Sequence, residues 1–220
     1  MIILNKNNST VSMIKRYLVL LVGLAIMAFG VAFSIKADLG TSPISSVPYV
    51  VSRFTPLTVG TATIIMHCVF ITIQILILRK NYQLIQLMQL PVAFFFGYLT
   101  DFGVWAVRGI QCDNYLERWG ICILGILLVA AGVSLEVKAN VVVLAGEGVV
   151  LAICRVLPKV KFGYMKVGFD VTLVLIACIL SILFIGHLQG VREGTLAAAL
   201  LVGLIAKQLG KLMAGWKLEG

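Results

Sequence analysis

Charged side chains are scarce in this chain: Asp, Glu, Lys and Arg together make up only 12% of its 220 residues. A soluble globular domain carries about 25% charged residues, so the composition argues against one. Hydrophobic residues account for 60% of the chain, and its mean hydropathy is +1.06. The sequence therefore predicts an integral membrane protein whose first partner is the lipid bilayer.

Signatures of enzymes and of metal sites are missing as well. The two histidines and five cysteines form no CxxC motif and no Cys/His cluster, which argues against a metal centre and a disulfide framework. The sequence also has no P-loop, GxSxG or HExxH motif. We therefore expect a protein that is not an enzyme and that uses neither a cofactor nor a metal.

The net charge of +9 raises the question of a nucleic-acid partner. The basic residues, however, are spread over the ends of apolar segments. Lys15 and Arg16 precede the first segment, and Arg79 and Lys80 follow the second. Basic residues in such positions orient membrane proteins, with the more positive side in the cytoplasm. We expect both termini in the cytoplasm and no nucleic-acid partner.

Six apolar runs are long enough, at about 20 residues each, to cross the hydrocarbon core of a bilayer. Backbone groups in lipid must pair within their own segment, so each run is predicted to be a helix. The fold class is therefore all-α, a polytopic bundle of membrane helices. The runs are Leu18–Ile35, Val59–Leu78, Leu84–Val107, Trp119–Val137, Met165–Ile185 and Thr195–Met213.

The chain also matches itself. When the sequence is shifted by 102 positions, residues 23–56 fall on residues 125–158 without a gap. Internal repeats of this kind are common in transporters. The shift superimposes Gly23, Ala28, Gly30, Val31, Lys36, Ala37, Val47, Arg53 and Pro56 on Gly125, Ala130, Gly132, Val133, Lys138, Ala139, Val149, Arg155 and Pro158.

The self-match divides the chain into two predicted membrane repeats, residues 13–108 and 119–214. The most polar interior stretch, residues 109–118, is the linker between them. A polar N-terminal tail, residues 1–12, and a short C-terminal tail, residues 215–220, complete the predicted organisation.

Each repeat contains one short segment between its long runs. Gly40–Arg53 is interrupted by prolines and Val141–Arg155 by glycines, and each, at about 14 residues, is too short to cross comfortably. If both segments re-enter the membrane, each repeat has three crossings and the repeats are inverted. If both cross, the protein has eight crossings and the repeats are parallel. Length favours the re-entrant arrangement.

Interrupted short segments at matching places are the best sequence pointer to the binding site of a repeat transporter. Ionisable groups at membrane depth are costly, so each is a functional candidate. The simpler interpretation makes them interfacial anchors, orientation charges or contacts between helices. The candidate pathway residues, taken from matching positions of the two repeats, are Lys36, Asp38, Ser45, Arg53, His67, Lys138, Asn140, Glu147, Arg155 and Asp170.

One stretch of the sequence is similar to a known group of proteins. The residues Ala37-Asp38-Leu39-Gly40-Thr41-Ser42-Pro43, followed by Thr58-Val59-Gly60, resemble the start of YczE/YyaS/YitT-type bacterial integral membrane proteins. The stretch Glu193–Gly203 resembles the GT-small-LLVG stretch of the same proteins. Ile44 departs from the pattern, which has tryptophan there, and Val141–Ala145 lacks a second LG.SP motif. The resemblance implies a multi-pass protein of the bacterial inner membrane and names no substrate.

These observations predict a small secondary transporter or permease for a small solute, with its site between the two repeats. Coupling would use ions or protons, and a homodimer is compatible with so small a bundle. The alternative is a membrane accessory or assembly protein that transports nothing and supports another protein.

Overall fold

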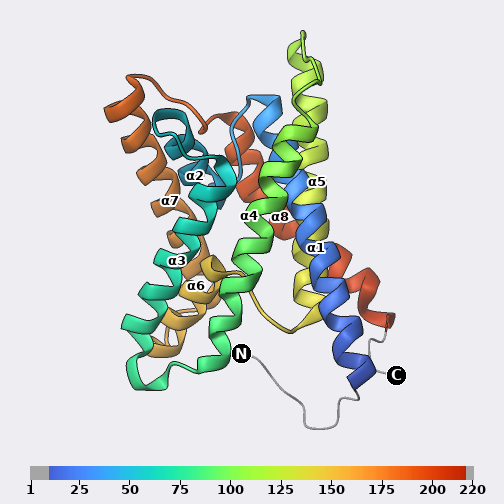
Figure 1. The fold of residues 1–220 in the computed structure, drawn as a ribbon, viewed down its shortest axis with the longest axis vertical. Coiled ribbons are helices and arrows are strands. Elements are labelled where there is room, and N and C mark those ends of the chain that lie inside the picture. The colour runs from blue at the N-terminus through green and yellow to red at the C-terminus, as the bar shows by residue number, and fades with distance from the viewer. Residues whose placement is uncertain (1–9, 217–220) are drawn as a thin grey trace.

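The computed structural model describes residues 10–216, and within that range the chain forms eight α-helices and no strand (Figure 1). The all-α prediction is confirmed. The helices are α1 Thr10–Ala37, α2 Pro43–Phe54, α3 Val59–Leu78, α4 Gln89–Ala106, α5 Tyr115–Ala139, α6 Ala145–Val156, α7 Phe162–Ile185 and α8 Glu193–Leu212.

Six of these helices, α1, α3, α4, α5, α7 and α8, are long and apolar enough to cross a membrane. They coincide with the six predicted runs and generally extend them by a few residues. α5, for example, begins at Tyr115 rather than at Trp119, because Glu117 accepts hydrogen bonds from the backbone N–H groups of Asp113 and Asn114 and so closes the first turn.

The predicted tails lie largely outside the described residues. Helix α1 begins at Thr10, so the last residues of the predicted tail 1–12 are helical, and residues 1–9 lie outside the described range. Of the C-terminal tail, residues 217–220 also lie outside it.

The two short helices do not cross the bundle. In Figure 1, α1 ends and α3 begins at the upper end of the molecule, with α2 between them at that end. α6 lies at the lower end, between the end of α5 and the start of α7. The long helices therefore alternate in direction, and the first residue of α1 and the last residue of α8 share the lower end. This is the six-crossing arrangement that length favoured.

The first and fifth helices pack against each other through glycines. A Cβ atom on Gly30 would lie 2.6 Å from the backbone nitrogen of Val129 and 2.8 Å from the carbonyl oxygen of Gly125. A Cβ atom on Gly132 would lie 2.6 Å from the carbonyl oxygen of Gly23. Small residues let membrane helices approach this closely. Gly23 meets Gly132 and Gly30 meets Gly125, so the two helices are antiparallel.

Two helices pack on this pair, α4 against α1 and α8 against α5. α3 also packs on α4, where a Cβ atom on Gly60 would lie 2.1 Å from the carbonyl oxygen of Gly97. A Cβ atom on Gly163 of α7 or on Gly203 of α8 would have no neighbour within 4 Å. The last two helices, α7 and α8, are therefore not joined at these glycines as α3 and α4 are at Gly60 and Gly97.

Candidate functional site

A small cavity of about 30 Å³ lies at the centre of the bundle. We call it the central cavity. It has room for a water molecule or a group of that size. Ser42, Ser45, Thr63 and His67 are its polar lining residues. The apolar lining comes from Met27, Val31, Ile44, Pro48, Met66, Phe96, Val129 and Leu144.

His67 is the most deeply buried of these polar groups, with 1% of its surface exposed. Its ring lies 6.2 Å from the rings of both Phe70 and Phe96, measured between centroids. Its Nδ1 atom has no hydrogen-bond partner in the structure, although buried polar groups nearly always have one. An unsatisfied nitrogen in a cavity marks a place where a water or a ligand group binds.

Both short helices begin at the central cavity. Ser42 is the residue before the first turn of α2, and Leu144 holds the same position before α6. The Ser42 hydroxyl donates to Ser45 Oγ at 3.0 Å, and Pro43 takes the first helical position, where its missing N–H is not needed. The start of a helix carries a partial positive charge, so both ends favour electronegative groups.

At α6 this positive end already has a partner. The buried carboxylate of Glu136, near the end of α5, accepts a hydrogen bond of 2.7 Å from the backbone N–H of Leu144. Glu147, in the first turn of α6, lies within electrostatic range of Glu136 and of Lys166 and Asp170 on α7, which form an ion pair with each other. Acidic groups therefore gather at the start of α6.

Below the central cavity, a buried amide closes the bundle. Gln74 of α3 donates from Nε2 to Gln89 Oε1 at 3.0 Å and to the carbonyl oxygen of Ala145 at 3.1 Å. These bonds tie α3, the start of α4 and the first residue of α6 together. We call this set of contacts the lower closure.

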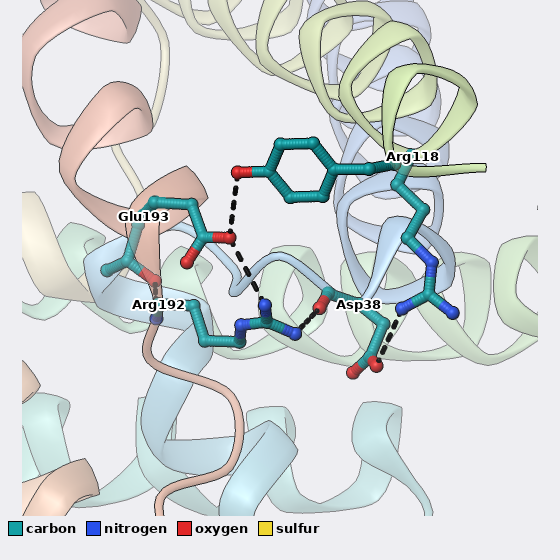
Figure 2. A network of polar contacts seen from close by, with 6 residues as sticks. Asp38, Arg118, Arg192 and Glu193 are labelled. Carbon is teal, nitrogen blue, oxygen red and sulfur yellow. Dashed lines mark hydrogen bonds and ion pairs between the residues drawn. The ribbon is translucent and has the colours of Figure 1, made fainter.

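Above the cavity, charged residues join three helix ends (Figure 2). Arg118 of α5 donates to the Asp38 carboxylate at 3.3 Å, and Arg192 donates to the Asp38 carbonyl oxygen at 2.8 Å. Arg192 also donates to Glu193 Oε1 at 3.2 Å, as does the hydroxyl of Tyr115 at 3.3 Å. We call these five residues the upper network.

Backbone contacts reinforce the upper network. The N–H of Gly194 donates to the carbonyl of Leu39 at 2.8 Å, and the N–H of Thr41 donates to the carbonyl of Gly190 at 3.0 Å. The loop between α1 and α2 is therefore held against the start of α8. Contacts of different chemistry therefore join helices toward the two ends of the bundle, ionic at the upper end and amide toward the lower end.

The structure brings Ser45 and His67 of the predicted pathway residues together at the central cavity. Glu147 and Asp170 lie within electrostatic range of each other at α6 and α7. These four residues occupy the interior or its edge.

Three predicted residues lie at the upper end. Lys36 donates from Nζ to the carbonyl of Arg108 at 3.0 Å, and Asp38 belongs to the upper network. Arg53 is exposed and makes a long contact of 3.4 Å with Gln189.

The last three predicted residues lie at the lower end. Asn140 ends α5 in the left-handed conformation with φ of 48°, which Asn tolerates better than most residues. Lys138 is in the last turn of the same helix, and Arg155 lines a small cavity beside Gln74. The ten predicted residues therefore do not form one site.

Glu136, Ser42 and Thr63 were not among the predicted residues. Glu136 carried a recognisable signal, because it is an acid within a predicted membrane span. Ser42 and Thr63 carried none, since small hydroxyl residues are common in membrane helices. Their place at the cavity depends on how the helices cross.

The fold and its buried polar centre define a multi-pass helical membrane protein with two short, non-crossing helices. The chain belongs to a family of unknown function, DUF6198, whose family model matches residues 14–211. This match agrees with the prediction of an uncharacterised family. It does not confirm the resemblance to YczE/YyaS/YitT-type proteins. No curated protein and no solved structure gives a significant match.

Proposed function

We propose that this protein is a small secondary transporter of the bacterial inner membrane and that the central cavity is its solute site. The observation that supports this most strongly is the unpartnered Nδ1 of buried His67, in a cavity at which both short helices begin. Transporter sites are typically built from the ends of such interrupted helices near the middle of the bilayer.

The arrangement of α1 and α5 supports the same proposal. Gly23 is matched with Gly125, and Gly30 with Gly132, under the shift of 102 residues. In the structure Gly23 contacts Gly132 and Gly30 contacts Gly125, which is the reciprocal pairing that a two-fold relation between inverted repeats requires. Rocking of one half against the other would open the cavity to alternate sides.

The charges of the two ends support a cytoplasmic lower end. Acidic residues offset the basic ones at the upper end, whereas basic residues dominate the lower end. Both termini then lie in the cytoplasm. The lower basic residues are Lys15, Arg16, Arg79, Lys80, Lys138, Arg155, Lys159, Lys161, Lys166, Lys207 and Lys211, and the upper acidic residues are Asp38, Asp101, Asp113, Glu117 and Glu193.

The two closures and the acidic groups at α6 fit a coupled transport cycle. The upper network and the lower closure would open in turn, so that the cavity meets one side at a time. Glu136 and Glu147 are the groups we assign to ion or proton coupling, because paired acids at membrane depth are typical of proton and cation relays.

The test is the reactivity of a cysteine at the cavity. In a variant that lacks the five native cysteines, Ser45→Cys should react with a membrane-impermeant thiol reagent from both sides of oriented vesicles. Ser46→Cys is the matched control, since Ser46 is buried in the same helix and does not line the cavity. Reaction from neither side, or from one side alone, would instead support an accessory protein with a static interior.

A further inference from the structure

We infer that the central cavity binds the carboxyl group of an amphiphilic carboxylic acid whose apolar chain lies in a groove between α2, α3 and α7. This inference deepens the proposed function and rests on it for the transport of that acid. The binding itself can be tested separately.

The head-group assignment comes from comparing the two halves. Under the shift of 102 residues, Leu144 is matched with Ser42 and Glu136 with Ser34. At α6 the N–H of Leu144 donates to the Glu136 carboxylate. In the first half, Ser34 stands at the position that matches Glu136. Within residues 10–216 the N–H of Ser42 has no acceptor. The start of α2 thus lacks the carboxylate that the start of α6 has.

A second observation marks the same place. Ser42 and His67 line the same cavity, and His67 Nδ1 is also without a partner. A carboxyl group has two oxygens, so it can satisfy both nitrogens at once. Burial makes each of these unmade hydrogen bonds costly, which favours a ligand that makes both.

The size of the cavity limits what else can enter. A volume of about 30 Å³ admits a carboxyl group and excludes the rest of a larger solute. The remainder of the ligand must occupy a neighbouring space, and the structure contains one.

An apolar groove of about 340 Å³ adjoins the central cavity. Pro48 and Met66 line both spaces, so they form the wall between them. Methionine is flexible, and a rotation of Met66 would join the two. The groove is otherwise lined by apolar side chains of α2, α3 and α7, including Val69, Leu173 and Ile176.

The groove faces the bilayer. Val69 and Ile176 are half-exposed, and both belong to helices that span the membrane. Hydrocarbon is the medium on that side, so an alkyl chain is the occupant that fits. An apolar space of a few hundred Å³ with polar groups at one end is the usual form of a small-molecule site. The acid would therefore enter sideways from the bilayer, between α3 and α7.

The experiment uses the full-length protein in lipid nanodiscs and two photoreactive probes, dodecanoic acid with a diazirine on its chain and the matching alcohol. The acid should label peptides that contain Met66 and Ile176 at least tenfold more than the alcohol does, because its two oxygens can bond both buried nitrogens and a single hydroxyl cannot. Equal labelling by both probes, or labelling spread evenly over α7 and α8, would overturn the inference.

Three matched pairs of variants locate the two ends of the ligand. Ser42→Pro removes the N–H at a φ of −60° that proline adopts, whereas Ser42→Ala keeps it. Ser34→Glu introduces a carboxylate at the position that matches Glu136, whereas Ser34→Ala does not. Ile176→Trp fills the groove, whereas Leu175→Trp adds the same ring on the exposed face of α7.

Acid labelling should be about tenfold lower in the first member of each pair than in the second. His67→Leu should lower it in the same way. If labelling does not distinguish the pairs while Ser45→Cys still reacts from both sides, this inference fails and the transporter proposal stands. If labelling follows the pairs but Ser45→Cys does not react from both sides, the acid site stands and transport fails.

Discussion

The carboxylate of Glu136 accepts a hydrogen bond of 2.7 Å from the backbone N–H of Leu144, and both residues are buried. Glu136 lies in the last turns of a membrane-spanning helix, and Leu144 precedes a short helix that does not cross. This bond joins the end of α5 to the start of α6, across the turn that begins at Asn140. It also places an acid inside the bundle, where it has a structural role in addition to any part in coupling.

Replacing Glu136 with leucine should destabilise the protein by about 1–3 kcal/mol, because the N–H of Leu144 would lose its acceptor in a buried place. Glu136→Gln is the control, since its amide oxygen can still accept the bond. Thermal unfolding in detergent, followed by size-exclusion chromatography, measures the difference. Equal stability of the two variants would show that the bond does not hold the start of α6.

Adding a methyl group at Gly30 should weaken the contact between α1 and α5. The new Cβ atom would lie 2.6 Å from a backbone nitrogen of the partner helix, so Gly30→Ala should cost about 1–3 kcal/mol of stability. Gly203→Ala is the control, because that position has no neighbour within 4 Å. The same unfolding assay applies, and a Gly30→Ala protein as stable as the control would contradict the close crossing.

Removing the Arg192 side chain should open the upper end. Arg192→Ala loses the bonds to the Asp38 carbonyl and to Glu193, which hold the loop before α2. We expect Ser45→Cys in this background to react several-fold faster with a thiol reagent added from the outside. Arg108→Ala, which removes an upper arginine outside the network, should leave the rate unchanged. A rate that does not distinguish the two variants would show that the network is not a closure.

Native Cys112 reports the orientation of the chain. It lies in the loop between α4 and α5 at the upper end, so a membrane-impermeant maleimide should label it in intact cells. Cys112→Ser should abolish that labelling. Asn81→Cys in the Cys112→Ser background, in the turn between α3 and α4, should be labelled only after the cells are made permeable. The opposite pattern would place the termini outside.

Much of the architecture could be predicted because membrane spans have a local signature. An apolar run of sufficient length must be a helix in lipid, whatever its neighbours are. The runs at Val59–Leu78 and Met165–Ile185 therefore correspond closely to α3 and α7. The short segments were predictable for the same reason, since the prolines in one and the glycines in the other limit their length.

The site could be predicted only in part. His67 was noticeable because it is one of two histidines and lies within an apolar run. Lys36 and Arg53 drew attention by their recurrence in both halves, yet their side chains make ordinary contacts at the upper end. Recurrence of a residue in a sequence does not make a site, because a site needs side chains from different helices to face the same space.

Composition and the length of the apolar runs determined the membrane environment, the helical class and the number of spans, because these follow from the transfer of each segment into lipid. Which residues meet was decided by the tertiary structure. α1 and α5 cross closely at their glycines, and α4 joins α1 to α3. The packing of the helices places Ser42, on the loop before α2, in the same cavity as His67, on α3.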